Sequence, residues 1–474
     1  MCLTEFKQIL DNLARSDALR DSVIGEGIMI PGLTGDVPLV YADYVASGRA
    51  MQPIESFVAE KILPFYANSH TEASYCGSYI TQLRRAARAE IARLVGAEAQ
   101  HSVIFTGSGA TASLNRLVSL LGVEQAERPV VFIGPYEHHS NILPWRESRA
   151  IVVEIPEAPG GGPDMQVLQE SLNEYEDSDL KIGSFSAASN VTGILTDTDT
   201  VTRLLHAHGG LAVWDYAGGG PYLPIDMGAQ GGEPKDAIVV SPHKFPGGPG
   251  ASGLLVVDQT IVRRTSPSWP GGGTVSFVSP WVHDYSDDLS TREEAGTPNV
   301  IGDIRAALAF LVKEAFGQQT ISAREHEFAQ MAWAAWGDSQ HLSVLGHRQA
   351  ERLPIFSFQV RDAEGHPVHQ QLFTRMLSDV YGIQARGGCA CAGPYAHRLL
   401  GIDQAASTEL HAALGRGEEL LKPGWVRLNL SYMMREDTVR YILRSVLELA
   451  RRTHELEPLY RADPTTARFA RRAA

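Results

Sequence analysis

The stretch Ala237-Ile-Val-Val-Ser-Pro-His-Lys-Phe-Pro-Gly-Gly-Pro-Gly250 carries the strongest signals in this sequence. Four apolar residues in a row, three of them β-branched, predict a buried strand of a parallel sheet. The run ends in Ser241, Pro242, His243 and Lys244, and a lysine at the end of a buried strand is unusual because lysine prefers water. A desolvated lysine amine is a nucleophile. Lys244 is therefore either a surface residue after an edge strand or a reactive group, and the rest of the sequence favours the second.

Composition excludes several classes of protein. The 474 residues can bury a large core and suit two domains. A formal charge of −14 argues against a nucleic acid or an anionic membrane as the main partner, because both need clustered Lys and Arg. The N-terminal residues 1–20 have the spacing of an amphipathic helix rather than a signal peptide, and no apolar run is long enough to cross a bilayer. We expect a cytoplasmic protein.

Strand-like and helix-like segments alternate through the first two thirds of the chain. This alternation predicts βαβ units and a mainly parallel sheet of seven strands, hence an α/β fold. The predicted helices include Thr111–Leu121, Met165–Tyr175 and Asp197–His208. The predicted strands are Ser102–Thr106, Pro129–Ile133, Ala150–Glu154, Lys181–Ser186, Leu211–Asp215, Ala237–Ser241 and Gly253–Val256.

After Asn299 the pattern changes to long helices mixed with a few strands, which predicts a smaller α+β domain. We expect an N-terminal helical segment at 1–36 that packs with the small domain, a large domain at 37–299 and the small domain at 300–457. The last residues, 458–474, carry four arginines and one aspartate, so we expect a solvated basic tail.

Polar residues gather at the carboxyl ends of the predicted strands, where open α/β sheets bind ligands. Gly107-Ser-Gly-Ala-Thr111 opens a helix and could cradle a phosphate. Asp215 ends an apolar strand and is either a helix cap or an acid that keeps a ring nitrogen protonated. His138 could stack on an aromatic ring or be an ordinary interior histidine. Together with Lys244, which would take an aldehyde carbon, these parts describe pyridoxal phosphate.

The sequence resembles the class V aminotransferase family of fold type I enzymes over roughly residues 37–450. It is most similar to the cysteine desulfurases, the selenocysteine lyases and the desulfurase part of molybdenum cofactor sulfurase. The resemblance rests on six motifs: Glu137-His-His-Ser-Asn-Ile-Leu-Pro-Trp145, Ser189-Asn-Val-Thr-Gly193, Asp215 with Ser-Pro-His-Lys244, Ala295-Gly-Thr-Pro-Asn299, Arg386-Gly-Gly-Cys-Ala-Cys391 and Val426-Arg-Leu-Asn-Leu430.

The resemblance implies which residues bind the cofactor. Lys244 would bond the aldehyde carbon, His138 would stack on the ring and Asp215 would pair with the pyridine nitrogen. The remaining cofactor contacts would come from Ala110, Thr111, Asn190, Ser241, His243 and Thr297. Thr297 would reach the phosphate of a second subunit, so we expect a homodimer with shared sites. Many family members have Gln where this chain has Gly218, on the substrate side of the ring.

The resemblance also implies a substrate site and a reactive thiol. Arg427 would clamp the substrate carboxylate, with Asn190 and Arg386 nearby. Cys391, five residues after Arg386, stands where desulfurases carry the cysteine that forms a persulfide. A metal could in principle bind Cys389 and Cys391 beside His138 and His139, but zinc pairs are usually spaced two to four residues apart and no second pair is evident, so we expect none.

These implications predict cleavage of the carbon–sulfur bond of L-cysteine to alanine, with a persulfide left on Cys391 for a sulfur-acceptor protein. Lys244, Cys391 and His138 are the expected catalytic residues. The alternatives are another class V reaction, namely transamination, epimerisation or carbon–sulfur or carbon–selenium cleavage of a different amino acid, and a scaffold that keeps the fold without catalysis. Because Lys244, Asp215 and Arg427 are all present, the sequence favours an enzyme.

Overall fold

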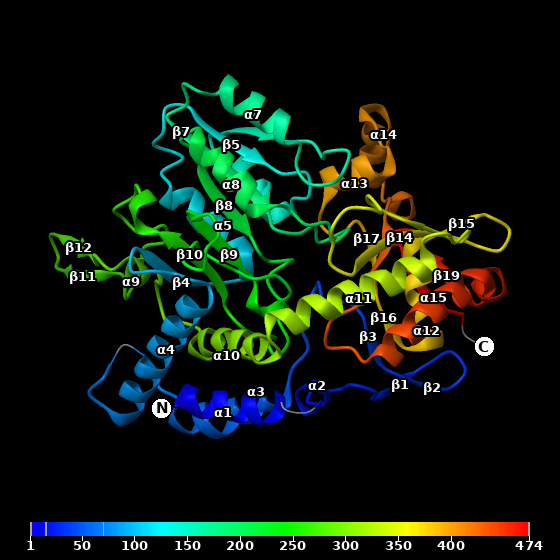
Figure 1. Ribbon diagram of the computed structural model, residues 1–474, viewed down its shortest axis with the longest axis horizontal. Coiled ribbons are helices and arrows are strands. Elements are labelled where there is room, and N and C mark those ends of the chain that lie inside the picture. Colours follow the sequence, from blue (N-terminus) through cyan, green and yellow to red (C-terminus); the bar gives the residue numbers. More distant parts are fainter. Residues whose placement is uncertain (1, 15–16, 70, 473–474) are drawn as a thin grey trace.

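The computed structural model describes residues 2–14, 17–69 and 71–472. Figure 1 shows a large domain built on one sheet and a smaller domain beside it, with the long helix α11 (Gln318–Trp336) running from the first toward the second. The large sheet has seven strands in the order β4-β10-β9-β8-β7-β5-β6. Their bounds are β4 His101–Gly107, β5 Pro129–Ile133, β6 Ile151–Glu154, β7 Leu180–Ser186, β8 Leu211–Asp215, β9 Ala237–Val240 and β10 Gly253–Asp258.

Six of these strands run in one direction, as the sequence predicts. The central pairs β5·β6, β5·β7, β7·β8 and β8·β9 are parallel, and only β10 is antiparallel to both of its neighbours, β9 and β4. The predicted bounds of all seven strands lie within two residues of the observed ones, because each strand is a short apolar run that ends at a polar or glycine residue.

Helices cover both faces of the sheet, so that alternate residues of a strand enter different apolar clusters. In β9, Ile238 and Val240 belong to one cluster, whereas Ala237 and Val239 belong to the other. The second cluster is closed by α5 (Gly109–Leu120). The first is closed by α4 (Tyr75–Leu94), α7 (Met165–Glu174), α8 (Thr198–Ala207) and α10 (Val300–Phe316).

The N-terminal segment divides between the two domains. Helix α1 (Cys2–Ala14) packs on α4 and α10 and places Leu3, Phe6 and Leu10 in the apolar cluster of the large domain. Helix α10 lies in the same cluster, although the sequence pattern assigned it to the small domain. The hairpin of β1 (Met29–Pro31) and β2 (Asp36–Pro38) lies against the small domain at α12. Residues 1–36 therefore contact both domains, with α1 on the large domain and the hairpin on the small one.

The small domain is built on an antiparallel sheet covered by helices α12 and α15. The sheet order is β13-β14-β18-β17, with β15 paired to β14. The bounds are β13 Leu342–Val344, β14 Ile355–Arg361, β15 Pro367–Val368, α12 Gln370–Tyr381, β16 Ile383–Gln384, β17 Arg386–Gly388, α13 Gly393–Leu400, α14 Gln404–Gly415, β18 Trp425–Asn429 and α15 Glu436–Leu456.

The expected solvated tail is instead largely a folded hairpin. Strands β19 (Tyr460–Asp463) and β20 (Arg468–Arg471) pair with each other, and the Tyr460 side chain is buried. Arg471 donates to both carboxylate oxygens of the buried Asp379 on α12, at 2.8 and 2.9 Å. Asp379 also accepts from Arg375 at 2.8 Å. This buried carboxylate explains why part of a basic tail packs against the domain.

Shorter elements connect these layers. They are α2 Ala18–Asp21, β3 Val40–Tyr41, α3 Gln52–Phe57, α6 Leu143–Arg146, β11 Val275–Val278, β12 His283–Tyr285 and α9 Leu289–Glu293. Strands β11 and β12 form a hairpin that projects from the large domain at the left of Figure 1. Within the described residues, none of the helices is long and apolar enough to cross a membrane.

We predict that Arg471→Ala lowers the free energy of unfolding by about 1–3 kcal/mol, because the buried Asp379 carboxylate loses its two hydrogen bonds from this side chain. Urea denaturation measures the change. Arg461→Ala is the matched control, since Arg461 lies exposed in the same hairpin and its loss should change stability by less than about 0.5 kcal/mol. Equal effects of the two substitutions would contradict the structural role of Arg471.

Candidate active site

Asp215 and Lys244 meet at the carboxyl edge of the large sheet. Asp215 is the last residue of β8, and Lys244 ends the short turn Pro242–Lys244 that follows the neighbouring parallel strand β9. Burial lowers the pKa of Lys244 to about 8, Asp215 opposes this shift, and Arg427 and Arg386 lower the pKa further. A substantial fraction of the Lys244 amine is therefore neutral and nucleophilic near pH 8.

The Asp215 carboxylate lacks a full set of partners. Its Oδ1 atom accepts the Ala217 N–H at 2.7 Å, whereas no described residue donates a hydrogen bond to Oδ2. Burial raises the pKa of Asp215, and the Ala217 N–H and Lys244 oppose that shift. A cationic N–H placed at Oδ2 would stabilise the ionised carboxylate. This is the environment that a protonated ring nitrogen requires.

An anion cradle lies at the N-terminus of α5, beside the turn that carries Lys244. Gly109 has a φ of +61°, and a Cβ on it would stand 2.9 Å from the Ser241 Oγ and 3.0 Å from the His243 ring. The Ala110 N–H donates to the Ser241 Oγ at 3.0 Å. The Thr111 hydroxyl lies 2.7 Å from that of Ser140. Backbone N–H groups, hydroxyls and the helix dipole thus converge where a phosphate could bind.

His138 is held as a neutral ring. Burial, with Lys244, His139 and Arg427 adding to the effect, lowers its pKa to about 4. Its Nδ1 atom accepts the Ser140 N–H at 3.1 Å, which fixes the ring orientation. A neutral ring can lie against an aromatic ligand without adding charge.

The preceding residue, Glu137, is a buried acid that sequence reasoning did not assign to the site. It accepts three hydrogen bonds: from the Ser186 N–H at 2.8 Å, from the Ser186 hydroxyl at 2.7 Å and from the Asn141 amide at 2.5 Å. Burial raises its pKa to about 7 despite these bonds. Glu137 thereby ties the loop that carries His138 to the end of β7.

Two arginines share one buried carboxylate beside Lys244. Asp43 accepts from Arg386 through Oδ2 at 2.9 Å and from Arg427 through Oδ1 at 3.0 Å. Arg427, only 4% exposed, also donates to the Asn190 carbonyl at 3.0 Å, and its Nε has no partner in the described structure. The free Nε and the buried, unpartnered Asn190 Oδ1 are polar atoms available to a ligand. Sequence reasoning missed Asp43, although an acid after an apolar strand is the signal that identified Asp215.

Cys391 stands exposed on a strained loop next to these groups. Ala390 and Cys391 both adopt left-handed backbone conformations, with φ of +53° and +55°, which are unfavourable for side chains. The loop is held from both sides, because His139 N–H donates to the Cys391 carbonyl and the Asn190 amide donates to the Ala390 carbonyl, each at 2.9 Å. The thiol is near enough to interact electrostatically with Arg427.

The structure brings together all of the predicted site residues except Thr297. Thr297 is exposed, and no described contact joins it to the groups above. A Cβ added at Gly218 would stand 3.6 Å from the Asn190 Cβ, which is an ordinary van der Waals contact. Within the described ranges, no group of three or more His, Cys, Asp or Glu side chains is placed to hold a metal ion.

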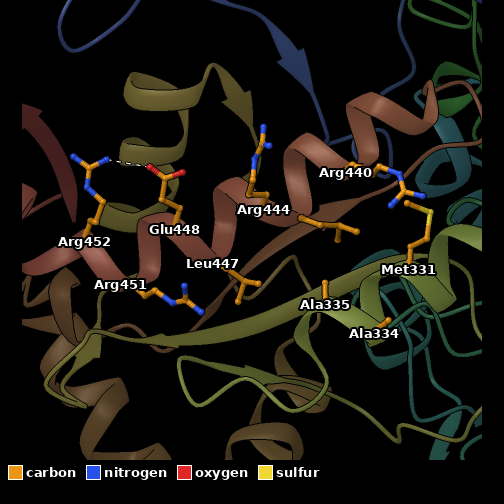
Figure 2. Close-up of a pocket in the computed structure, with 10 residues that line it drawn as sticks. Met331, Ala334, Ala335, Arg440, Arg444, Leu447, Glu448, Arg451 and Arg452 are labelled. Atoms are coloured by element: carbon orange, nitrogen blue, oxygen red, sulfur yellow. Dashed lines mark hydrogen bonds and ion pairs between the residues drawn. The ribbon is translucent and has the colours of Figure 1, made fainter.

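A second hollow lies away from this site. A groove of about 830 Å³ lies between α11 and α15, and its lining residues are drawn in Figure 2. It is lined by Met331, Ala334, Ala335, Leu443, Leu447, Glu448 and four arginines. The four are Arg440, Arg444, Arg451 and Arg452, of which Arg452 pairs with Glu448 at 3.1 Å. None of the predicted site residues lines this groove, so it is not the place where the sequence motifs converge.

The matching family model and the most similar relatives point to the same family. The family model for aminotransferase class-V matches residues 40–435. A probable cysteine desulfurase of Halalkalibacterium halodurans is 27% identical over 362 residues, covering 75% of this chain and 85% of that protein. A second, from Vibrio cholerae, is 28% identical over 363 residues, with the same coverage.

Solved structures show the same fold. The apo cysteine desulfurase of Thermococcus onnurineus superposes with a TM-score of 0.72 at 23% identity, covering 87% of this chain and 94% of that chain. A cysteine desulfurase of Escherichia coli superposes with a TM-score of 0.67 at 22% identity, covering 86% and 94%.

We predict that the Lys244 amine of cofactor-free protein reacts with a small aldehyde and cyanoborohydride at a rate that rises through about pH 8. Asp215→Asn should move this midpoint to lower pH, by roughly one pH unit, because the negative charge that raises the pKa of Lys244 is removed. Mass spectrometry of the modified peptide measures the rate. The exposed Lys422 is the internal reference and should not respond to the substitution, and a Lys244 midpoint above pH 10 would contradict the prediction.

Proposed function

Because the chain belongs to the aminotransferase class V family, we propose that it is a pyridoxal phosphate-dependent cysteine desulfurase. The observation that carries the proposal is the convergence of Lys244, Asp215, Arg427 and an exposed Cys391 at one edge of the sheet. The curated relatives named above support the same reaction, since they are probable cysteine desulfurases that match along most of their length.

The residues present fit pyridoxal phosphate. The N-terminus of α5 with Ser241 and His243 would hold the phosphate, and the unpartnered Oδ2 of Asp215 would hold a proton at the ring nitrogen. His138 would cover the ring face and Asn190 would lie near the ring hydroxyl. The bound cofactor supplies an electron-accepting ring that stabilises negative charge at the α-carbon of an amino acid.

Three side chains orient and deprotonate the substrate. The Arg427 Nε and the half-exposed Arg386 bind the substrate carboxylate, which fixes the α-hydrogen relative to Lys244. The Lys244 amine removes the α-proton and holds it at Nζ, a role that its pKa of about 8 suits near neutral pH.

Cys391 completes the reaction by attacking the substrate sulfur as a thiolate. A sulfur–sulfur bond forms on Cys391, the carbon–sulfur bond breaks, and its electron pair stays on the substrate carbon, which takes a proton to become alanine. The two electrons that the joined sulfurs give up remain with the substrate carbon, so the step needs no external oxidant. Because Cys391 is exposed, its persulfide is accessible to the thiol of a sulfur-acceptor protein.

The β11–β12 region supports a homodimer. Trp269 is 70% exposed and Trp281 87% exposed, and Phe277, Val278 and Val282 are exposed beside Trp281. Exposed apolar side chains in this number are typical of an interface. Thr297 follows this region in sequence and would reach the phosphate site of the second subunit.

The free thiols at Cys76, Cys389 and Cys391 suit the reducing cytoplasm.

The decisive test is incubation of the protein with L-cysteine and a reductant, with alanine and sulfide quantified. We expect equal yields that fall to background in Cys391→Ser while the cofactor absorbance is retained, because only the sulfur-accepting group is lost. Cys76→Ser is the matched control and should keep full activity. Cofactor absorbance without alanine formation in the unmodified protein would contradict the desulfurase proposal and indicate another class V reaction.

We predict that Phe277→Asp with Trp281→Asp converts the dimer to a monomer, because two charges placed in an apolar interface lose their solvation. Sedimentation equilibrium measures the mass of the particle. Leu421→Asp is the control, since Leu421 lies on the small domain and is about as exposed as Phe277, and its replacement should leave the dimer intact. An unmodified protein with the mass of one chain would rule out the homodimer.

A further inference from the structure

The turn that carries Cys391 has a backbone shape that its own residues do not favour. The Ala392 N–H donates to the Cys389 carbonyl at 3.2 Å, so Ala390 and Cys391 are the two inner residues of a four-residue turn. Both have positive φ, +53° and +55°, a combination for which such turns normally use Gly, Asn or Asp. A turn of this kind persists only where contacts from outside hold it.

Helix α13, which begins directly after this turn, has no cap of its own. Its N-cap residue, Ala392, makes no side-chain cap bond, and the first N–H of the helix, that of Gly393, donates to the His139 Nε2 at 2.9 Å. The acceptor lies 254 positions earlier in the sequence. An imidazole of the large domain thus serves this helix N-terminus in place of the local side-chain oxygen that usually caps one.

His139 holds the turn and the helix at the same time. Its backbone N–H donates to the Cys391 carbonyl at 2.9 Å, while its ring accepts from Gly393. Between these two contacts the Ala392 side chain is fully buried, in the same apolar cluster as Tyr136. A Cβ on Gly393 would stand only 3.1 Å from the ring nitrogen, so glycine lets the backbone lie closer to the ring than another residue would.

Only a neutral His139 ring can make this contact. A protonated ring carries an N–H on both nitrogens, and it would set a donor and a positive charge against the N–H groups of a helix start. Burial, with Arg146 adding to the effect, lowers the pKa of His139. Among the described residues, the other titratable neighbours are Cys391 and His138, whose ring centroid lies 6.1 Å away. The contact is therefore complete at neutral pH and is lost as the pH falls through the lowered pKa.

We propose that His139 is a positioning residue for Cys391: by accepting the Gly393 N–H at the start of α13, it keeps the turn 389–392 in the conformation that presents the thiol. The inference deepens the proposed function, since it names the group that positions the proposed sulfur-accepting thiol. It stands on contacts within the chain, so its test needs no substrate.

Hydrogen–deuterium exchange of two backbone amides tests the proposal on the full-length protein as purified. Gly393 reports the contact with His139, and Ala392, whose N–H donates to the Cys389 carbonyl, reports the turn. Electron-transfer fragmentation of peptic peptides resolves the two amides. In His139→Ala we expect both amides to exchange about tenfold faster, the effect of losing one hydrogen bond that orders the whole turn.

Two variants separate positioning from damage to the fold. His139→Gln supplies an amide oxygen that can accept from the same N–H, and it should keep both exchange rates within about threefold of those of the unmodified protein. His411→Ala is the matched control, because it removes an exposed histidine from α14, the next helix of the same domain. It should leave both exchange rates unchanged.

The pH profile adds a readout that a purely structural ring would not move. After correction for the intrinsic exchange rate, the protection of Ala392 and Gly393 in the unmodified protein should fall as the pH is lowered from 8 to 4.5. In His139→Gln the protection should stay level, because an amide side chain does not titrate. Glu137, a buried acid with a pKa of about 7, is present in both proteins, so its protonation cannot account for a difference.

Faster exchange of Gly393 alone in His139→Ala would overturn the proposal, because the ring would then cap the helix without positioning the turn. Unchanged exchange of both amides would overturn it as well, as would an equal effect of His411→Ala. The same holds for exchange in His139→Gln as fast as in His139→Ala, and for pH profiles that run parallel in His139→Gln and the unmodified protein. None of these results depends on alanine formation from L-cysteine, so a failure of the proposed reaction would be recognised separately.

Discussion

The buried carboxylate of Asp215 is the constraint on which the site depends. An ionised group in a protein interior costs several kcal/mol unless a cation or several hydrogen bonds compensate it. Asp215 has one backbone N–H on Oδ1 and the charge of Lys244, while Oδ2 is free of donors in the described structure. Burial raises the pKa of Asp215 and lowers that of Lys244. The Asp215 carboxylate can therefore bind an external cation, and the Lys244 amine can react as a nucleophile.

Three segments that are far apart in sequence complete the site around this pair. Asp43, Arg386 and Arg427 join the N-terminal segment to two strands of the small domain, and Arg427 reaches the Asn190 carbonyl of the large domain. The Asn190 amide in turn holds the loop of Cys391. The side chains proposed to bind the substrate and the proposed reactive thiol are therefore positioned by contacts between the domains, whereas Asp215 and Lys244 both follow strands of the large sheet.

The sequence was sufficient to predict the sheet and to place Asp215 and Lys244 at its edge, because both depend on local signals. Each strand is a short apolar run; Asp215 ends one such run, and Lys244 ends the short turn after another. What escaped prediction depends on distant partners. Asp43 binds arginines more than 340 positions away, and Arg471 binds the buried Asp379, which lies 92 positions earlier. A basic segment near a chain end is usually solvated, and its own composition does not show that a buried acid elsewhere in the fold will bind it.

One measurement tests most directly whether Lys244 is the cofactor lysine. The purified protein is reduced with borohydride and digested, and mass spectrometry identifies which lysine carries the phosphopyridoxyl group. We predict a single adduct on Lys244. The competitor is Lys313, whose pKa burial lowers to about 7 but whose Nζ donates to the Gly220 and Leu223 carbonyls. An adduct on Lys313, or none at all, would contradict the assignment.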